Sequence, residues 1–227
     1  MNALDKNARI AGLIYVFIGL TAPFSLMVVP TKLNAGGHSS VARVLELETM
    51  LRWGVVLELA GVVAFTALAF ALYRLFADVD RFKASIMSVL ILLSVPVSFL
   101  NVVHELTAIT IARGDVLTGF TTAQLDGLVT LVLRMYGRGV AVNQVFWGLW
   151  LIPLGLLVIQ SRFFPRILGI LLLVNAAAYP LLTLTSLLAP DYSSTMMKIV
   201  FPAELGELWI MLWMLIRGAR PAPEAPR

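Results

Sequence analysis

Apolar residues of this chain fall into six long runs, and polar residues gather in the segments between the runs. About 20 consecutive apolar residues are needed for a helix to cross the hydrocarbon core of a bilayer. Six runs reach this length, at residues 9–30, 53–76, 84–105, 139–160, 165–188 and 198–217. The pattern therefore predicts an all-α fold, a six-helix transmembrane bundle that forms a single domain over residues 1–218.

The connections between the runs alternate in length. Residues 77–83 and 161–165 are short connections, which predict tight helical hairpins. On the opposite side, Gly36-Gly37 interrupts the chain before residues 41–51, whose apolar positions recur at helical spacing. We expect a short helix on the outer membrane surface there.

A second outer helix is expected to begin at Thr122, because Thr121 and Thr122 can cap a helix and apolar residues follow on one face. The fourth span is then either one long helix or a helix broken at Gly137-Arg138-Gly139. The tail at residues 219–227 is rich in proline and is expected to be disordered. The predicted apolar face of the outer helix comprises Leu125, Leu128, Val129 and Val132.

Basic residues indicate the orientation of the bundle. Six spans place both termini on one side, and that side carries ten of the seventeen Lys and Arg residues: Lys6, Arg9, Arg74, Arg81, Lys83, Arg162, Arg166, Arg217, Arg220 and Arg227. The other side carries Lys32, Arg43, Arg52, Arg113, Arg134, Arg138 and Lys198. The positive-inside rule therefore predicts that both termini lie in the cytoplasm.

Composition restricts the functional classes further. Hydrophobic residues make up 59% of the chain and charged residues 13%, with a mean hydropathy of +0.90. A water-soluble enzyme or a nucleic-acid-binding protein needs more polar surface than this. The chain contains no cysteine, which excludes disulfides, thiolate metal sites and a cysteine nucleophile. We expect a membrane protein whose first partner is the lipid bilayer.

Polar residues inside the spans are the candidates for chemistry. A charged side chain in hydrocarbon costs about 2.5–3.5 kcal/mol on insertion scales, so such residues usually face a partner, water or a cavity. Counted from the span ends, these residues lie in the outer half of the membrane and predict a polar pocket that opens outward. The alternative is that the acids pair with Arg52, Arg134, Arg138 and His104 and only fix the helix register. The pocket candidates are Glu58, Asn101, His104, Glu105, Arg134, Arg138, Asn143, Gln144, Glu204 and Glu207.

A metal site is a second interpretation of the same residues. Glu204 and Glu207 are three residues apart and project from one helix face. With His104 and Glu58 from neighbouring helices, one nitrogen and three carboxyl ligands could hold zinc, manganese or iron. The spacing Glu-x-x-Glu is common, and the spans contain a single histidine. We therefore expect no cofactor, with a divalent metal as the alternative.

Glu207 is the deepest acid by this count, roughly 15 Å from the outer face at 1.5 Å per residue. A carboxyl group without a partner at that depth should be protonated. If Arg134, Arg138 or a bound cation compensates the charge, Glu207 should stay ionised.

Several short sequence blocks, taken in their order along the chain, indicate a family. They are Arg9-Ile-Ala-Gly-Leu-Ile-Tyr15, Leu51-Arg-Trp-Gly-Val55, Val145-Phe-Trp-Gly-Leu149, Leu154-Gly-Leu-Leu-Val-Ile-Gln-Ser161 with Pro165-Arg-Ile-Leu-Gly169, and Pro202-Ala-Glu-Leu-Gly-Glu207 before Trp213 and Arg217-Gly218. From about residue 9 to 218 the chain resembles bacterial membrane proteins of the domain of unknown function 4386 family.

The resemblance implies a multi-helix protein of the bacterial cytoplasmic membrane and supplies no activity. The chain departs from the family pattern at two places. It has Leu57-Glu58 where the family often has an acid one residue away, and Trp150 where a histidine often follows the Phe-Trp-Gly block. Histidine chemistry shared by the family is therefore not expected here.

Three functional classes remain open. The first is a non-enzymatic protein that binds or conducts a small polar, cationic or lipid-headgroup ligand in the outward-facing pocket. The second is a metal-assisted intramembrane hydrolase or transferase that acts on lipid. The third is an accessory or sensory membrane subunit. The sequence identifies no catalytic residue and no oligomeric state.

Overall fold

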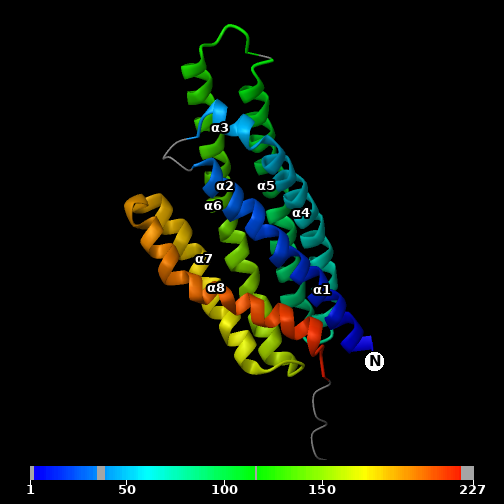
Figure 1. The fold of residues 1–227 in the computed structure, drawn as a ribbon. Coiled ribbons are helices and arrows are strands. Elements are labelled where there is room, and N and C mark those ends of the chain that lie inside the picture. The colour runs from blue at the N-terminus through cyan, green and yellow to red at the C-terminus, as the bar shows by residue number, and fades with distance from the viewer. Residues whose placement is uncertain (1–2, 35–38, 116, 221–227) are drawn as a thin grey trace, which may run out of the picture. The chain divides into compact units, whose positions relative to one another are not determined.

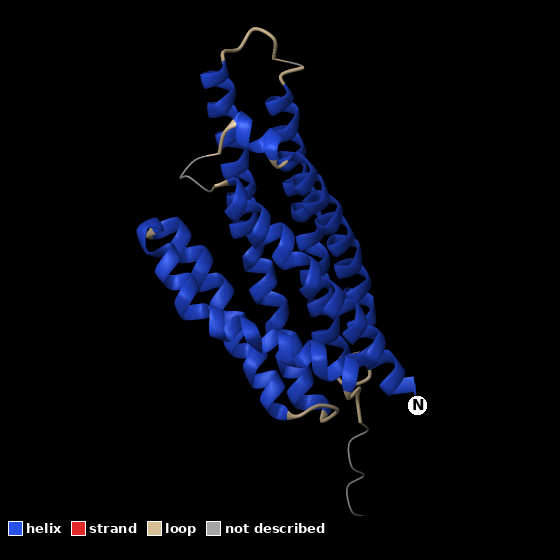
Figure 2. Ribbon diagram, in the orientation of Figure 1, coloured by secondary structure: helices blue, strands red, loops and turns tan. Residues whose placement is uncertain are grey.

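The computed structural model describes residues 3–34, 39–115 and 117–220. These residues form helices joined by short connections, with no strand among them (Figures 1 and 2). The break expected at Gly36-Gly37 and the disorder expected for the tail beyond Arg220 fall outside the described residues.

Six helical segments in the described ranges are long and apolar enough to cross a membrane, which confirms the predicted all-α class and the six spans. The first segment contains three consecutive helices. A π-helix, η1, follows Pro23 and interrupts the regular α-helical hydrogen bonding. The segment is made of α1 (Ala3–Pro23), η1 (Phe24–Val28) and α2 (Val29–Leu33).

The later helices extend beyond several predicted bounds. The fourth span is a single unbroken helix of 40 residues, α6, which continues through Gly137-Arg138-Gly139. The surface helix expected over 41–51 ends at Glu46, because Leu47 leaves the helical conformation and Glu48 begins the next helix. The bounds are α3 (Val41–Glu46), α4 (Glu48–Phe76), α5 (Arg81–Arg113), α6 (Thr122–Ser161), α7 (Arg166–Leu188), η2 (Pro190–Tyr192) and α8 (Ser193–Ile216).

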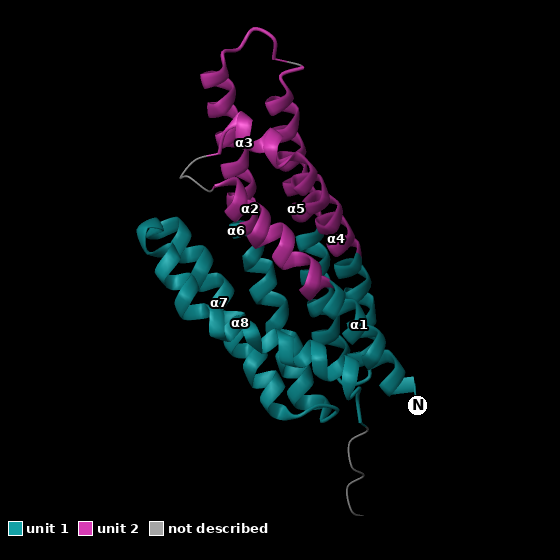
Figure 3. Ribbon diagram, in the orientation of Figure 1, with its two compact units in different colours: residues 1–17, 64–95, 141–227 teal, residues 18–63, 96–140 magenta. Residues whose placement is uncertain are grey.

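The chain divides into two compact units (Figure 3). Unit 1 contains residues 1–17, 64–95 and 141–227, and unit 2 contains residues 18–63 and 96–140. Helices α1, α4, α5 and α6 contribute a segment to each unit. A single domain over residues 1–218 stays a prediction.

The core of unit 2 explains why α5 and α6 are longer than a bilayer requires. Ile109, Ile111 and Ala112 of α5 are buried in one apolar cluster with Val44 of α3 and Val129 of α6. The start of α6 is capped as expected, with Thr121 Oγ1 accepting from the Gln124 amide and Gln124 Oε1 accepting from the Thr121 amide. The predicted apolar face packs on the same cluster through Leu125, Leu128, Val129 and Val132.

Close helix contacts at glycine organise unit 1. A Cβ atom on Gly169 of α7 would lie 2.6 Å from the carbonyl oxygen of Gly155 on α6. A Cβ on Gly206 of α8 would lie 3.1 Å from the carbonyl oxygen of Leu171 on α7. Small residues allow backbones in membranes to approach this closely, and the packing holds α7 firmly between α6 and α8.

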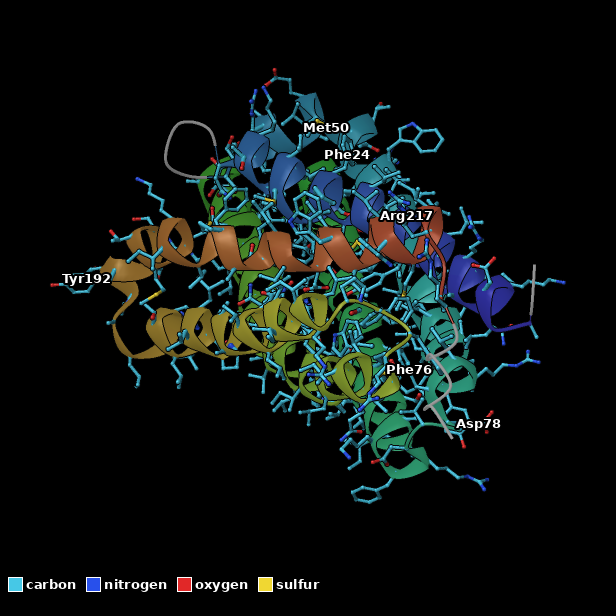
Figure 4. All side chains as sticks on the ribbon, turned by 90° about the horizontal axis from the view of Figure 1, so that it is seen from below. Phe24, Met50, Phe76, Asp78, Tyr192 and Arg217 are labelled. Carbon is cyan, nitrogen blue, oxygen red and sulfur yellow. The ribbon has the colours of Figure 1, made fainter. Side chains whose placement is uncertain are left out.

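The connection between α4 and α5 is a tight, capped turn. Asp80 Oδ1 accepts from the Lys83 amide at 3.0 Å, and Asp80 Oδ2 accepts from Lys83 Nζ. These two hydrogen bonds, the side-chain bond first, hold the pKa of the Asp80 carboxyl below its ordinary value. Figure 4 labels Phe76 and Asp78 at this turn.

Candidate functional site

Glu207 lies past the middle of α8. The helix begins at Ser193, so Glu207 is about 21 Å from its start and about 13.5 Å from its end at Ile216, at 1.5 Å per residue. Helix α8 begins five residues before the predicted residue 198, which places Glu207 further from the start of the helix than the sequence count gave. The expected position of the polar residues in the outer half of the membrane stays a prediction.

Three side chains of unit 1 donate hydrogen bonds to Glu207. Asn175 Nδ2 donates to Oε1 at 2.7 Å, and the Tyr179 hydroxyl donates to the same oxygen at 2.9 Å. The Tyr15 hydroxyl donates to Oε2. Asn175 and Tyr179 are four residues apart on α7 and so share one face, while Tyr15 comes from α1. Glu207 is only 9% exposed, and both of its carboxyl oxygens are therefore bonded.

Tryptophan side chains of α6 support the two tyrosines. The ring of Trp150 packs against Tyr15 with centroids 5.8 Å apart, and Trp147 packs edge to face on Tyr179 at 6.1 Å. Trp150 also meets Phe65 at 5.7 Å and is 2% exposed. These contacts restrict where the phenol groups can point, and they surround Glu207 with aromatic side chains.

Glu207 has no basic partner within the described residues, where the ion pairs all involve other acids. Its three donors are neutral. Glu204, one turn earlier on the same helix face, is a second, half-buried acid. The side-chain oxygen of Asn175 is buried and has no hydrogen-bond donor in this part of the chain. The Glu207 carboxyl group and the Asn175 side-chain oxygen can therefore both accept hydrogen bonds from a cation. No ion pair of the described residues supplies a positive charge to Glu207.

Unit 2 holds a second buried acid group. Glu58 Oε2 on α4 accepts from the Tyr136 hydroxyl on α6 at 2.9 Å. Glu105 on α5 is 1% exposed and lies within electrostatic reach of Glu58 and Tyr136. Its Oε2 atom has no hydrogen-bond partner among the described residues. Glu105 thus differs from Glu207 in its lack of donors.

Asn101 and His104 lie within one turn of Glu105 on α5. Asn101 is 3% exposed, and its side-chain amide rests against Gly139 of α6 so closely that a Cβ there would overlap it. His104 is half-buried, and its Nδ1 atom is buried without a hydrogen-bond partner in the described structure.

The ion pairs of the described residues do not involve any of the four acids considered as pocket candidates, Glu58, Glu105, Glu204 and Glu207. Arg134 and Arg138 are exposed on α6 and form no ion pair in the described ranges. Arg52 binds Glu48 at 2.7 Å, and Arg113 binds the same carboxylate at 2.6 Å. Arg52 lies one turn from Glu48 on α4, and Arg113 reaches the same carboxylate from the end of α5. Neither arginine of α6 compensates Glu207.

The last two pocket candidates lie on α6, where Asn143 is buried and Gln144 is half-buried.

Metal binding was the alternative interpretation of four of the candidate residues. No group of three or more His, Cys, Asp or Glu side chains that could hold a metal ion occurs in the described part of the chain. The set of His104, Glu58, Glu204 and Glu207 therefore gains no support from the geometry.

Sequence reasoning did not single out Tyr15, Tyr136, Tyr179 or Asn175. Asn175 offered a signal, because it interrupts an apolar run and precedes Tyr179 by one helical turn. The tyrosines offered little, because a tyrosine in a span is equally consistent with packing.

A family model described as a domain of unknown function, DUF4386, matches residues 10–218. The chain belongs to the DUF4386 family. This confirms the resemblance seen in the ordered sequence blocks. No curated protein and no solved structure matches the chain. The description of the family names no activity, and the two buried acid groups are the features of the chain that bear on function.

Proposed function

We propose that this DUF4386 protein is a non-enzymatic membrane protein that binds and carries a small cation at Glu207. One observation supports the proposal above the others. A buried glutamate accepts three hydrogen bonds from neutral donors and has no basic partner among the described residues. An ionisable residue within a span suggests a ligand site because its burial is costly.

The three donors favour the ionised form of Glu207. Hydrogen bonds to a charged group contribute about 1.5–3 kcal/mol each in proteins, although bonds inside membranes average only about 0.6 kcal/mol. They disperse the negative charge but do not cancel it. A bound cation would supply the missing positive charge. If the cation is a protonated amine, the free side-chain oxygen of Asn175 can accept a hydrogen bond from one of its N–H groups.

The aromatic side chains around Glu207 favour an organic ammonium ion. Ammonium groups bind the faces of tryptophan and tyrosine rings, with about 0.5–2 kcal/mol for each contact. Tyr15, Tyr179, Trp147 and Trp150 provide such rings in unit 1. We therefore propose a small protonated or quaternary amine rather than an inorganic ion as the ligand.

Thermal melts of the purified protein in detergent test this proposal. Methylammonium and tetramethylammonium should raise the melting temperature of the wild type more than Na⁺ or Mg²⁺ at equal ionic strength. Glu207→Gln should abolish this response. It should also lower the free energy of unfolding by about 1–3 kcal/mol, because an amide NH₂ then faces donors that lose their acceptor.

Two further variants serve as controls. Tyr179→Phe removes one donor and should weaken the amine response without abolishing it, at a stability cost of about 0.5–1.5 kcal/mol. Asp191→Asn changes an exposed acid in the same unit and should leave both quantities unchanged. If Glu207→Gln keeps the wild-type melt and the wild-type amine response, Glu207 is a packing residue and the proposal fails.

We also propose that both termini are cytoplasmic and that the protein lies in a bacterial cytoplasmic membrane. The ten-to-seven distribution of basic residues supports this orientation. The chain has no native cysteine, so single cysteines report position directly. In intact cells an impermeant maleimide should label Gly119→Cys and leave Asp78→Cys unlabelled. The reverse pattern would invert the topology.

The metal-assisted enzyme at His104, Glu58, Glu204 and Glu207 is the competing class. Elemental analysis of gently purified protein separates the two. A transition metal at one equivalent per chain would favour the enzyme and count against amine binding at Glu207.

A further inference from the structure

Glu105 is the most deeply buried acid of the described spans. It is 1% exposed, and its Oε2 atom receives no hydrogen bond. The groups that face it from neighbouring helices are Glu58 of α4 and Tyr136 of α6. The Tyr136 hydroxyl is bonded to Glu58. A negative charge on Glu105 would therefore meet a second carboxyl group and no donor at its free oxygen.

The other charged groups of unit 2 do not neutralise Glu105. His104, next to it on α5, is half-buried and forms no ion pair in the described ranges. Asp126 accepts the Val41 amide at 2.7 Å. The basic and acidic residues around the unit are paired with one another or exposed: Arg43 with Glu46, Arg52 and Arg113 with Glu48, and Lys32, Asp115, Arg134 and Arg138 exposed.

The smallest cation fits this position best. A metal ion needs several oxygen or nitrogen ligands, and no set of three acidic, histidine or cysteine ligands exists among the described residues. A proton needs only one carboxyl oxygen. It also converts that oxygen into a donor, which removes the charge and allows a hydrogen bond to an acceptor nearby.

A cavity lies along the part of α5 that follows Glu105. A cavity of about 220 Å³ is lined by Leu106, Ile109, Thr110 and Arg113 of α5, with Arg52 and Asp115. Ile109 follows Glu105 by four residues and so lies on the same helix face. A water molecule occupies about 30 Å³ in the liquid, so the cavity has room for several. Glu105 does not line this cavity itself, and Ile109, which does, follows it by about one helical turn.

We propose that Glu105 is a proton-binding site, neutral at physiological pH, that exchanges its proton with water in this cavity. Binding forms one O–H bond on the carboxylate, and release gives that proton to water. The inference is independent of amine binding at Glu207, because the two acids belong to different units.

Infrared spectroscopy and thermal melts of the full-length protein test the proposal. The wild type should show the carbonyl band of a protonated carboxylic acid at neutral pH, and Glu105→Gln should lose most of it. Glutamine has the shape of the protonated acid, so Glu105→Gln should melt at or above the wild-type temperature at pH 7. At pH 10 the wild type should fall below the variant by at least about 2–4 °C.

Glu46→Gln, an exposed acid of the same unit, is the control and should keep the band. Absence of any protonated carboxyl band in the wild type overturns the proposal, even if Glu105→Gln fails to fold. Retention of the band in Glu105→Gln overturns it as well. A rise in melting temperature with Na⁺ at fixed pH that disappears in Glu105→Gln would assign a metal cation instead. The amine response should persist in Glu105→Gln whichever result is found.

Discussion

Glu207 in unit 1 and Glu105 in unit 2 are both buried glutamates within spans, yet their surroundings differ in one respect. Three side chains donate to Glu207, whereas the free oxygen of Glu105 has no donor in the described structure. Donors stabilise a carboxylate, and desolvation without donors stabilises the acid. Burial alone therefore does not decide the charge of an acid in a membrane protein.

The comparison implies opposite responses to one chemical change. Glutamine is a poor substitute for a carboxylate that accepts three bonds, because its NH₂ cannot accept. It is a good substitute for a neutral acid. Glu207→Gln should therefore destabilise the protein, and Glu105→Gln should not. If both variants changed the melting temperature in the same direction and by the same amount, the distinction between the two sites would be lost.

Trp150→Ala should give the largest loss in the free energy of unfolding, because the indole ring packs on Tyr15 and holds its hydroxyl group on Glu207. Trp150 is 2% exposed and packs on Tyr15 and Phe65. Loss of a buried tryptophan costs about 3–5 kcal/mol in a well-packed core. Chemical unfolding in mixed micelles should show this loss, together with a weaker amine response.

Trp209→Ala is the matched control, since Trp209 lies two residues from Glu207 on α8 and is 62% exposed. Its cost should be within about 0.5 kcal/mol. Equal costs for the two tryptophan variants would show that aromatic packing is not what distinguishes the Glu207 site.

Asp80→Asn should give the smallest change in stability. The change should appear at acidic pH, whereas that of Glu105→Gln should appear at alkaline pH. Hydrogen bonds from Lys83 lower the pKa of the Asp80 carboxyl. Its contribution to stability is therefore complete above the ordinary carboxyl value of about 3.9 and is lost as pH falls through its folded value. Melts from pH 6 to pH 2 should show an acid-range loss that is smaller in Asp80→Asn.

Asp78→Asn, an exposed acid of the same turn, should leave the acid-range loss unchanged. An identical acid limb in the wild type and Asp80→Asn would show that the cap of α5 contributes nothing measurable. The Glu105 effect appears on the alkaline side, so the two titrations can be separated in one pH series.

Hydropathy predicted all six spans, because bilayer thickness fixes the length of an apolar run. The same rule ended the third span at residue 105, whereas α5 continues to Arg113. Ile109 and Ile111 lie beyond the required length but are buried in the core of unit 2. Lengths set by packing within the protein are not visible to a rule based on the membrane.

The acids of the candidate sites were also predictable, since charge inside a span is rare. Their partners were not. Hydropathy does not state which helices are neighbours, and so it could not bring Tyr15 from the first helix to Glu207 in the last. The alternative of ion pairs with Arg134 and Arg138 finds no support in the described residues, where both arginines are exposed and form no ion pair. A neutral phenol satisfies a buried carboxyl oxygen without the cost of burying a second charge.

The contact between Gly155 and Gly169 joins α6 and α7 through their backbones, with Leu173 and Ile159 as the nearest side chains. Packing of this kind depends on shape and is indifferent to ionisation and to salt. We therefore expect α7, which carries Asn175 and Tyr179, to keep its position when the charge on Glu207 changes. If the proposed cation binds at Glu207, its capture and release should then exchange hydrogen bonds locally and leave the helix frame in place.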